Sequence, residues 1–231
     1  MTKIETITKE EFEKILPVIT LENGVELTPG KIRTNRNHYR TWLKDGFRLA
    51  LESGRRREEI CQMKWSDIIH DSSENPVCIK VFDIKVNNIR GVEKEEEKKI
   101  VYVPITENLM QLLNELGYEK NKNSDKYILA PELKSQRGKV MCDTLSRAFA
   151  HYIKLTGIKK DLSFKCLRKT YITNLAITMG SNTKMVTGHS GDDVLNRHYI
   201  NHFEVSKSLR NFQVFGNETE RKQELNAIRE N

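Results

Sequence analysis

Apolar residues recur at helical spacing over most of the chain, and this pattern predicts a mainly helical protein. Thr8 is followed three residues later by Glu11 and then by an apolar face, which is the pattern of a capped helix start. A second apolar face predicts a helix from Thr34 to Glu52. Further helices are predicted at residues 57–64, 106–116, 143–155, 164–179, 183–187 and 192–200.

Two segments instead have the composition of β-strands. Residues 77–84 and 100–105 are rich in β-branched and aromatic side chains. Residues 93–99, between them, have the sequence EKEEEKK, which is too charged to be buried. We therefore predict a long hairpin with an exposed tip, within a small antiparallel three-stranded sheet set among helices. This is an α+β fold.

The chain has 231 residues and no internal repeat or linker rich in Gly, Pro or Ser divides it. We expect one domain over residues 1–215. Residues 216–231 form a polar C-terminal tail, which we expect to be disordered or to act as an interaction arm.

Charge adds a first indication of function. The formal net charge is +7, which favours a polyanionic partner but also suits a basic soluble protein without one. Four basic residues, each four positions after the last, lie along one face of the second predicted helix. They form either a solvated face or a surface that contacts a DNA backbone. These residues are Arg36, Arg40, Lys44 and Arg48.

The cysteines and the apolar runs indicate the compartment of the protein and whether it crosses a membrane. The four cysteines are scattered without the spacing of a zinc site or a disulfide framework, which favours core thiols in a reducing compartment. No apolar run approaches the roughly 18 residues of a membrane span. We expect a cytoplasmic protein with no membrane contact.

Chemistry-bearing residues gather in two distant segments. The first, residues 53–59, has the sequence SGRRREE and leads into WSDI at residues 65–68. The second contains KCLR at residues 165–168, GHS at residues 188–190 and then Tyr199. A phenol attacks a phosphodiester only where cations stabilise the charge that develops, so this pattern indicates covalent chemistry on DNA.

The ordered set of motifs resembles the catalytic domain of the tyrosine recombinase (phage integrase) family. The resemblance runs from Thr8 to just past Tyr199. It implies a site-specific DNA recombinase that cuts and rejoins DNA through a 3′-phosphotyrosine, without metal, ATP or another cofactor. The sequence shows no acidic metal cluster and no phosphate-binding glycine loop, which agrees with that expectation.

Two arginines align with the family's phosphate-binding pair. Arg56 corresponds to the first catalytic arginine and Arg168 to the second. A guanidinium matches phosphate oxygens in a bidentate fork and keeps its charge. Glu59 lies on the same helix face as Arg56 and is expected to hold it, while Arg55 and Arg57 flank Arg56 as competitors for the inward position.

The remaining positions of the family pattern follow in order. Tyr199 corresponds to the nucleophile and His189 to a histidine that hydrogen-bonds the phosphate. Lys165 stands where most members have histidine. A lysine can contact the phosphate, but it shuttles a proton near pH 7 only if its pKa is strongly depressed.

The family also has a lysine on the hairpin that protonates the departing 5′ oxygen. Lys85, at the end of the first predicted strand, is our candidate for this general acid. Other hairpin lysines compete with it: Lys80, Lys94, Lys98 and Lys99.

The resemblance further implies double-stranded DNA as the partner and a homo-oligomer, a tetrameric synapse, on that DNA. Members usually carry a helical core-binding domain ahead of the catalytic one, and we expect that domain to be missing here. Two other functions stay open. One is a type IB topoisomerase-like enzyme, and the other is a catalytically degenerate DNA-binding regulator of a mobile element, which Lys165 would fit.

Overall fold

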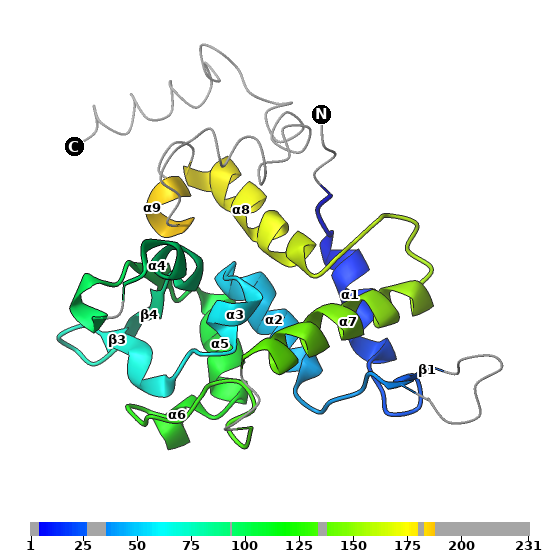
Figure 1. Cartoon of the computed structure of the whole chain (residues 1–231), viewed down its shortest axis with the longest axis horizontal. Coiled ribbons are helices and arrows are strands. Elements are labelled where there is room, and N and C mark those ends of the chain that lie inside the picture. The colour runs from blue at the N-terminus through cyan, green and yellow to red at the C-terminus, as the bar shows by residue number, and fades with distance from the viewer. Residues whose placement is uncertain (1–4, 27–35, 93, 134–137, 180–182, 188–231) are drawn as a thin grey trace, which may run out of the picture.

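The computed structural model describes residues 5–26, 36–92, 94–133, 138–179 and 183–187. A three-stranded antiparallel sheet with the order β3-β4-β5 lies at one side of the mainly helical domain, and a two-stranded β1-β2 ribbon lies at the opposite side (Figure 1). The predicted α+β class and three-stranded sheet are confirmed. The strands are β1 Val25–Glu26, β2 Arg36–Asn37, β3 Ile68–His70, β4 Pro76–Phe82 and β5 Ile100–Pro104.

The helices follow the sequence pattern closely in the second half of the chain. The α-helices are α1 Lys9–Val18, α2 Leu43–Ser53, α3 Arg57–Ile60, α4 Ile84–Arg90, α5 Glu107–Glu115, α6 Tyr118–Asn121, α7 Lys139–Leu155, α8 Lys165–Met179 and α9 Thr183–Thr187, with 3-10 turns η1 Trp65–Asp67 and η2 Glu95–Glu97. The predicted capping box of α1 is confirmed, because Thr8 and Glu11 exchange side-chain-to-backbone hydrogen bonds. The predicted helix at 192–200 and the tail at 216–231 lie outside the described residues.

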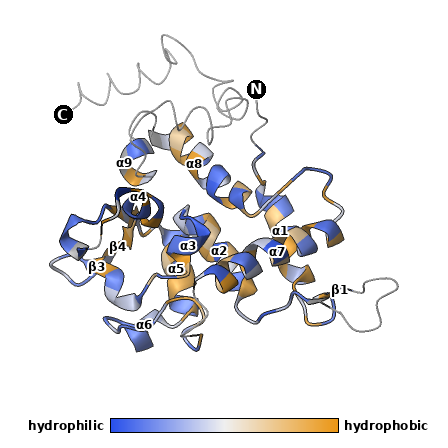
Figure 2. Ribbon diagram, in the orientation of Figure 1, coloured by the Kyte–Doolittle hydropathy of each residue, from blue (hydrophilic) through white to orange (hydrophobic). Residues whose placement is uncertain are grey.

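The core forms where α2, α7 and the start of α8 meet. Phe47 of α2 packs edge-on against Phe149 of α7, with ring centroids 5.2 Å apart, and against Phe164, at 5.9 Å. Hydrophobic ribbon is concentrated on helices in the middle of the molecule, such as α5, whereas α6 and the loops near β3 are mostly hydrophilic (Figure 2). In the sheet, the buried pairs Ile79–Val103 and Val81–Val101 are direct cross-strand neighbours.

The predicted helix at 34–52 was wrong at its start. Residues 36–37 pair with β1 instead, and α2 begins at Leu43. The side chain of Asn37 accepts a hydrogen bond from the backbone N–H of Tyr39, at 2.8 Å, and this local bond competes with helix formation.

The basic stripe expected along that helix therefore does not form. Arg40 precedes α2 and donates to the backbone carbonyl of Asn37 at 3.1 Å. Arg48 makes an ion pair with Glu115 of α5. These contacts favour the interpretation of the stripe as ordinary surface.

The connection between β4 and β5 differs from the predicted hairpin tip. Its first part is helix α4, which begins directly after Asp83, and η2 follows. The Asp83 carboxylate accepts a hydrogen bond from the backbone N–H of Val86, at 3.2 Å, and so caps the first turn of α4. The cap moves the residues after Phe82 out of the sheet.

Candidate functional site

A sharp turn between α2 and α3 brings the arginine motif to the surface of the core. α2 ends at Gly54, whose φ of 61° is the left-handed conformation that glycine adopts at little cost. A Cβ on Gly54 would lie 2.0 Å from Cδ1 of Tyr171 in α8. Gly54 therefore allows both the turn and the close approach of α8.

We expect Gly54→Ala to destabilise the protein more than Gly157→Ala. Both glycines have positive φ, so each substitution costs about 1–2 kcal/mol in the backbone. Only Gly54 also has a ring in the way, and such overpacking adds about 1–3 kcal/mol. Urea unfolding of the two variants measures the difference, and equal losses would contradict this account of the turn.

Arg55 is a structural residue. It is only 2% exposed, and its Nη2 donates to the carbonyl oxygens of Val186, at 3.4 Å, and Thr187, at 3.2 Å. Burial lowers the pKa of Arg55, and the nearby carboxylate of Glu59 opposes that shift. Arg55 thus ties the end of α9 to the turn between α2 and α3.

Arg56 is partly exposed and lies between two acids. Its side chain is 21% exposed, and Nη1 donates to Oε1 of Glu59 at 2.7 Å and to Oδ1 of Asp83 at 3.0 Å. The side chains of both acids are almost fully buried. Glu59 also accepts from the backbone N–H of Arg56, at 3.0 Å, so it holds Arg56 at two points.

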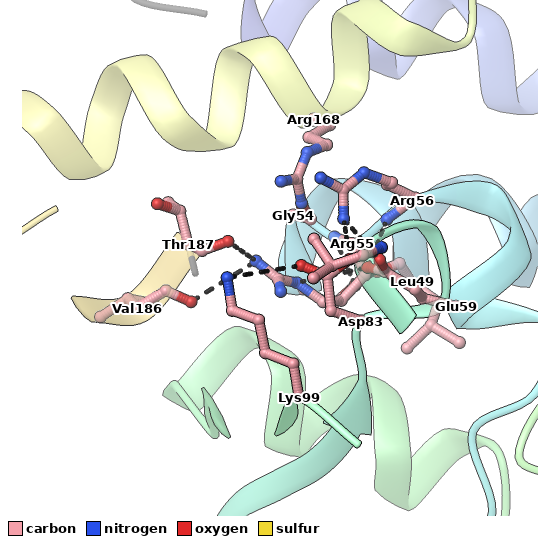
Figure 3. Close-up of polar contacts among 12 residues, drawn as sticks. Leu49, Gly54, Arg55, Arg56, Glu59, Asp83, Lys99, Arg168, Val186 and Thr187 are labelled. Carbon is pink, nitrogen blue, oxygen red and sulfur yellow. Dashed lines mark hydrogen bonds and ion pairs between the residues drawn. The ribbon is translucent and has the colours of Figure 1, made fainter. Parts of the chain in front are cut away.

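Arg168 reaches the same turn from α8. It is 6% exposed, and its Nη1 donates to the carbonyl oxygen of Gly54, two residues before Arg56 in the chain (Figure 3). The structure thus brings together the turn of Arg56 and the side chain of Arg168, although 111 residues lie between them in the sequence (168 − 56 − 1). Lys165 is the first residue of α8, and its side chain is exposed.

The hairpin lysines occupy distinct places. Lys85 lies exposed in the first turn of α4. Lys99 precedes β5, and its Nζ is 3.8 Å from Oδ2 of Asp83, the acid that also accepts from Arg56. Lys80 and Lys98 lie over the ring of Phe82, at 5.0 and 5.6 Å from its centroid.

Asp83 was missed in the sequence. It joins Arg56 to Lys99, yet it lies inside a segment whose composition predicts a strand. The signal that could have found it is local: an aspartate that follows a β-rich run is a common helix cap. His189 and Tyr199 lie outside the described residues, so the structure does not place them.

In the described part of the chain, one group of side chains has the composition of a metal site, and it does not include the residues of the arginine turn. Glu26, His38 and His151 offer ligand atoms within 4.8 Å of one another. However, the rings of His38 and His151 are stacked, 4.4 Å apart and 12° from parallel. Their lone pairs therefore lie in two nearly parallel planes, which is a poor arrangement for two ligands of one ion. Among the described residues, no helix is long and apolar enough to cross a membrane.

A mainly helical α+β domain in which an arginine of α8 meets the turn after α2 defines the integrase-type catalytic domain. The chain belongs to the phage integrase family, whose model matches residues 6–204. No curated protein matches the chain.

Solved structures share the fold at low sequence identity. A lambda integrase dimer bound to a COC′ core site is 19% identical, with a TM-score of 0.52 over 83% of this chain and 60% of that one. XerA recombinase is 15% identical, with a TM-score of 0.55, and the match covers 91% of this chain and 65% of that one. The Tn1549 transposon integrase in complex with a circular intermediate DNA is 16% identical, with a TM-score of 0.54 over 92% and 67%. The chain thus spans about three fifths of the length of the lambda integrase chain.

Proposed function

We propose that the protein is a site-specific DNA recombinase that breaks and rejoins double-stranded DNA in the cytoplasm. The observation that carries this proposal is the meeting of Arg56 and Arg168 at one turn, in a chain of the phage integrase family. Two guanidinium groups can neutralise the two non-bridging oxygens of a phosphodiester as charge builds on them.

In the proposed reaction, the Tyr199 oxygen attacks the scissile phosphorus and the bond to the 5′ oxygen breaks. The tyrosine releases its proton to solvent water, and the 5′ oxygen takes up a proton from a general acid of the protein. The product is a 3′-phosphotyrosine and a free 5′ hydroxyl. A 5′ hydroxyl from a second duplex then attacks the phosphotyrosine and completes strand exchange. Each step replaces one phosphate ester bond with another, so the reaction needs no ATP.

The proton donor to the 5′ oxygen is a lysine. Lys85 is the candidate from the sequence, and Lys99 is a second candidate because its ammonium group shares Asp83 with Arg56. His189 would hydrogen-bond the phosphate. Lys165 would contact it from the exposed start of α8 as a cation.

Recombination requires pairing of DNA sites, and we propose a homo-oligomer on DNA. A lambda integrase structure is a tetramer bound to a Holliday junction, which supports a tetrameric synapse for this chain. The specific observation behind a second function is Lys165, in place of the family's usual histidine. A member that binds DNA without cutting it would regulate a mobile element.

Trapping of the covalent intermediate tests the proposal. We expect the protein to form an SDS-stable adduct with a duplex that is nicked beside the scissile phosphate, in EDTA and without ATP. The target site for this duplex comes from selection of cleaved sequences in a random library. Binding without an adduct would favour the regulator, and relaxation of supercoiled DNA of arbitrary sequence by a monomer would favour a topoisomerase.

A further inference from the structure

Asp83 uses its two carboxylate oxygens for different partners. Oδ1 accepts from Nη1 of Arg56, at 3.0 Å, and from the backbone N–H of Val86, at 3.2 Å. Oδ2 lies 3.8 Å from Nζ of Lys99. In Figure 3, Arg56 and Lys99 approach this carboxylate from two sides. Asp83 is only 2% exposed, so these partners take the place of the water that would otherwise hydrate its carboxylate.

The backbone of Lys99 is held by Asp83 and by Asn87 of helix α4. Its carbonyl accepts from the backbone N–H of Asp83, at 2.9 Å, and from Nδ2 of Asn87, at 3.2 Å. Its N–H donates to Oδ1 of Asn87, at 2.7 Å. These three bonds hold the start of β5 against α4. The long Lys99 side chain extends from this fixed backbone, and its charged end lies beside Oδ2 of Asp83.

We propose that Asp83 is a positioning residue, which sets the direction of Lys99 relative to Arg56 so that the ammonium faces the 5′ leaving oxygen of the phosphate held by Arg56. This proposal rests on the proposed recombinase function. As the bond between phosphorus and the 5′ oxygen breaks, a proton passes from Nζ of Lys99 to that oxygen, while the tyrosine oxygen bonds to phosphorus. Asp83 itself contacts neither reacting atom.

The substitution Asp83→Asn separates the two partners of this carboxylate. The amide oxygen replaces Oδ1, because that position faces two N–H donors, Arg56 and Val86. The amide NH₂ then replaces Oδ2 and presents a donor to the Lys99 ammonium, which is itself a donor. The variant therefore keeps the arginine contact and the cap of α4, and it loses the lysine contact.

A chemical substitution in the DNA substrate, at the leaving atom, detects the loss of the contact between Asp83 and Lys99. A sulfur in place of the bridging 5′ oxygen leaves as a thiolate and needs no proton donor. We expect Asp83→Asn to slow single-turnover cleavage of the ordinary phosphodiester roughly 100-fold, as misplacement of a reacting group does. Cleavage of the sulfur-bridged duplex should stay within about 3-fold of wild type, because only proton transfer is impaired.

Matched variants complete the experiment. Lys99→Ala should reproduce the oxygen-specific loss. Asp125→Asn, which alters an exposed carboxylate 3.3 Å from Nζ of Lys64, should cut both substrates at the wild-type rate. Thermal unfolding shows whether Asp83→Asn is folded.

The proposal is overturned if Asp83→Asn cuts both substrates normally, or slows both equally while folded. It is also overturned if Lys85→Ala, rather than Lys99→Ala, gives the oxygen-specific loss. The failure of the wild-type protein to cut either substrate would instead count against the recombinase function itself, so the two failures are distinguishable.

Discussion

Tyr199→Phe is expected to eliminate the covalent protein–DNA adduct while DNA affinity stays within about 2-fold of wild type. The substitution removes one oxygen, which is the proposed nucleophile, and leaves the ring in place. A nicked duplex lets the short fragment with the 5′ hydroxyl diffuse away, so that the adduct accumulates in the wild-type reaction. Denaturing gel electrophoresis measures the adduct, and a gel-shift titration measures the affinity.

Tyr171→Phe is the matched control for this experiment. Tyr171 lies on α8 against Gly54, and burial raises the pKa of its phenol, which makes it a poor nucleophile at neutral pH. This control should form the adduct at close to the wild-type yield. An adduct that persists in Tyr199→Phe, or that disappears only in Tyr171→Phe, would refute the assignment of the nucleophile.

Arg56→Lys is expected to slow the first turnover by about 10²- to 10³-fold, the loss that follows removal of one donor to a developing oxyanion. Lysine keeps the positive charge beside Glu59 and Asp83, which limits the damage to folding. It loses the planar fork that can hold a phosphate in a bidentate manner. Single-turnover cleavage of the nicked duplex measures the effect.

The neighbouring Arg57→Lys is the matched control, because it removes a guanidinium group from the same motif at a different position. Arg57 has a more exposed side chain, and it donates to Glu58, at 2.9 Å, and to Ser146, at 2.8 Å. We expect its cleavage rate to stay within about 3-fold of wild type. A similar loss in both variants would show that Arg56 has no special place in the reaction.

Elements with strong local signals were predictable from the sequence. The capping box at Thr8 and Glu11 and the two long strands lie where the pattern places them, although the first strand ends two residues earlier than predicted. The start of α2 was not predictable in this way, because apolar spacing continues upstream of Leu43 while the backbone pairs with β1. A two-residue strand is too short to show the alternation of apolar and polar residues that marks a longer strand, so its pairing with β1 cannot be seen in the sequence.

The candidate site was predictable as a set of residues but not as a network. Three successive arginines have the same chemistry in sequence, and only the packing of α8 and α9 on the turn shows which of them is buried. Asp83 could not be assigned because its partners, Arg56 and Lys99, come from distant parts of the chain. The places of His189 and Tyr199 remain predictions from the family pattern.

The different surroundings of Arg55, Arg56 and Arg57 have a consequence for ionic strength. At about 0.15 M salt, mobile ions screen exposed charges beyond roughly 8 Å but hardly reach buried ones. Added salt should therefore weaken the ion pair of Arg57 at the surface and leave the tie from Arg55 to α9 intact. If the protein binds DNA as proposed, high salt should release that DNA before it loosens the scaffold behind Arg56.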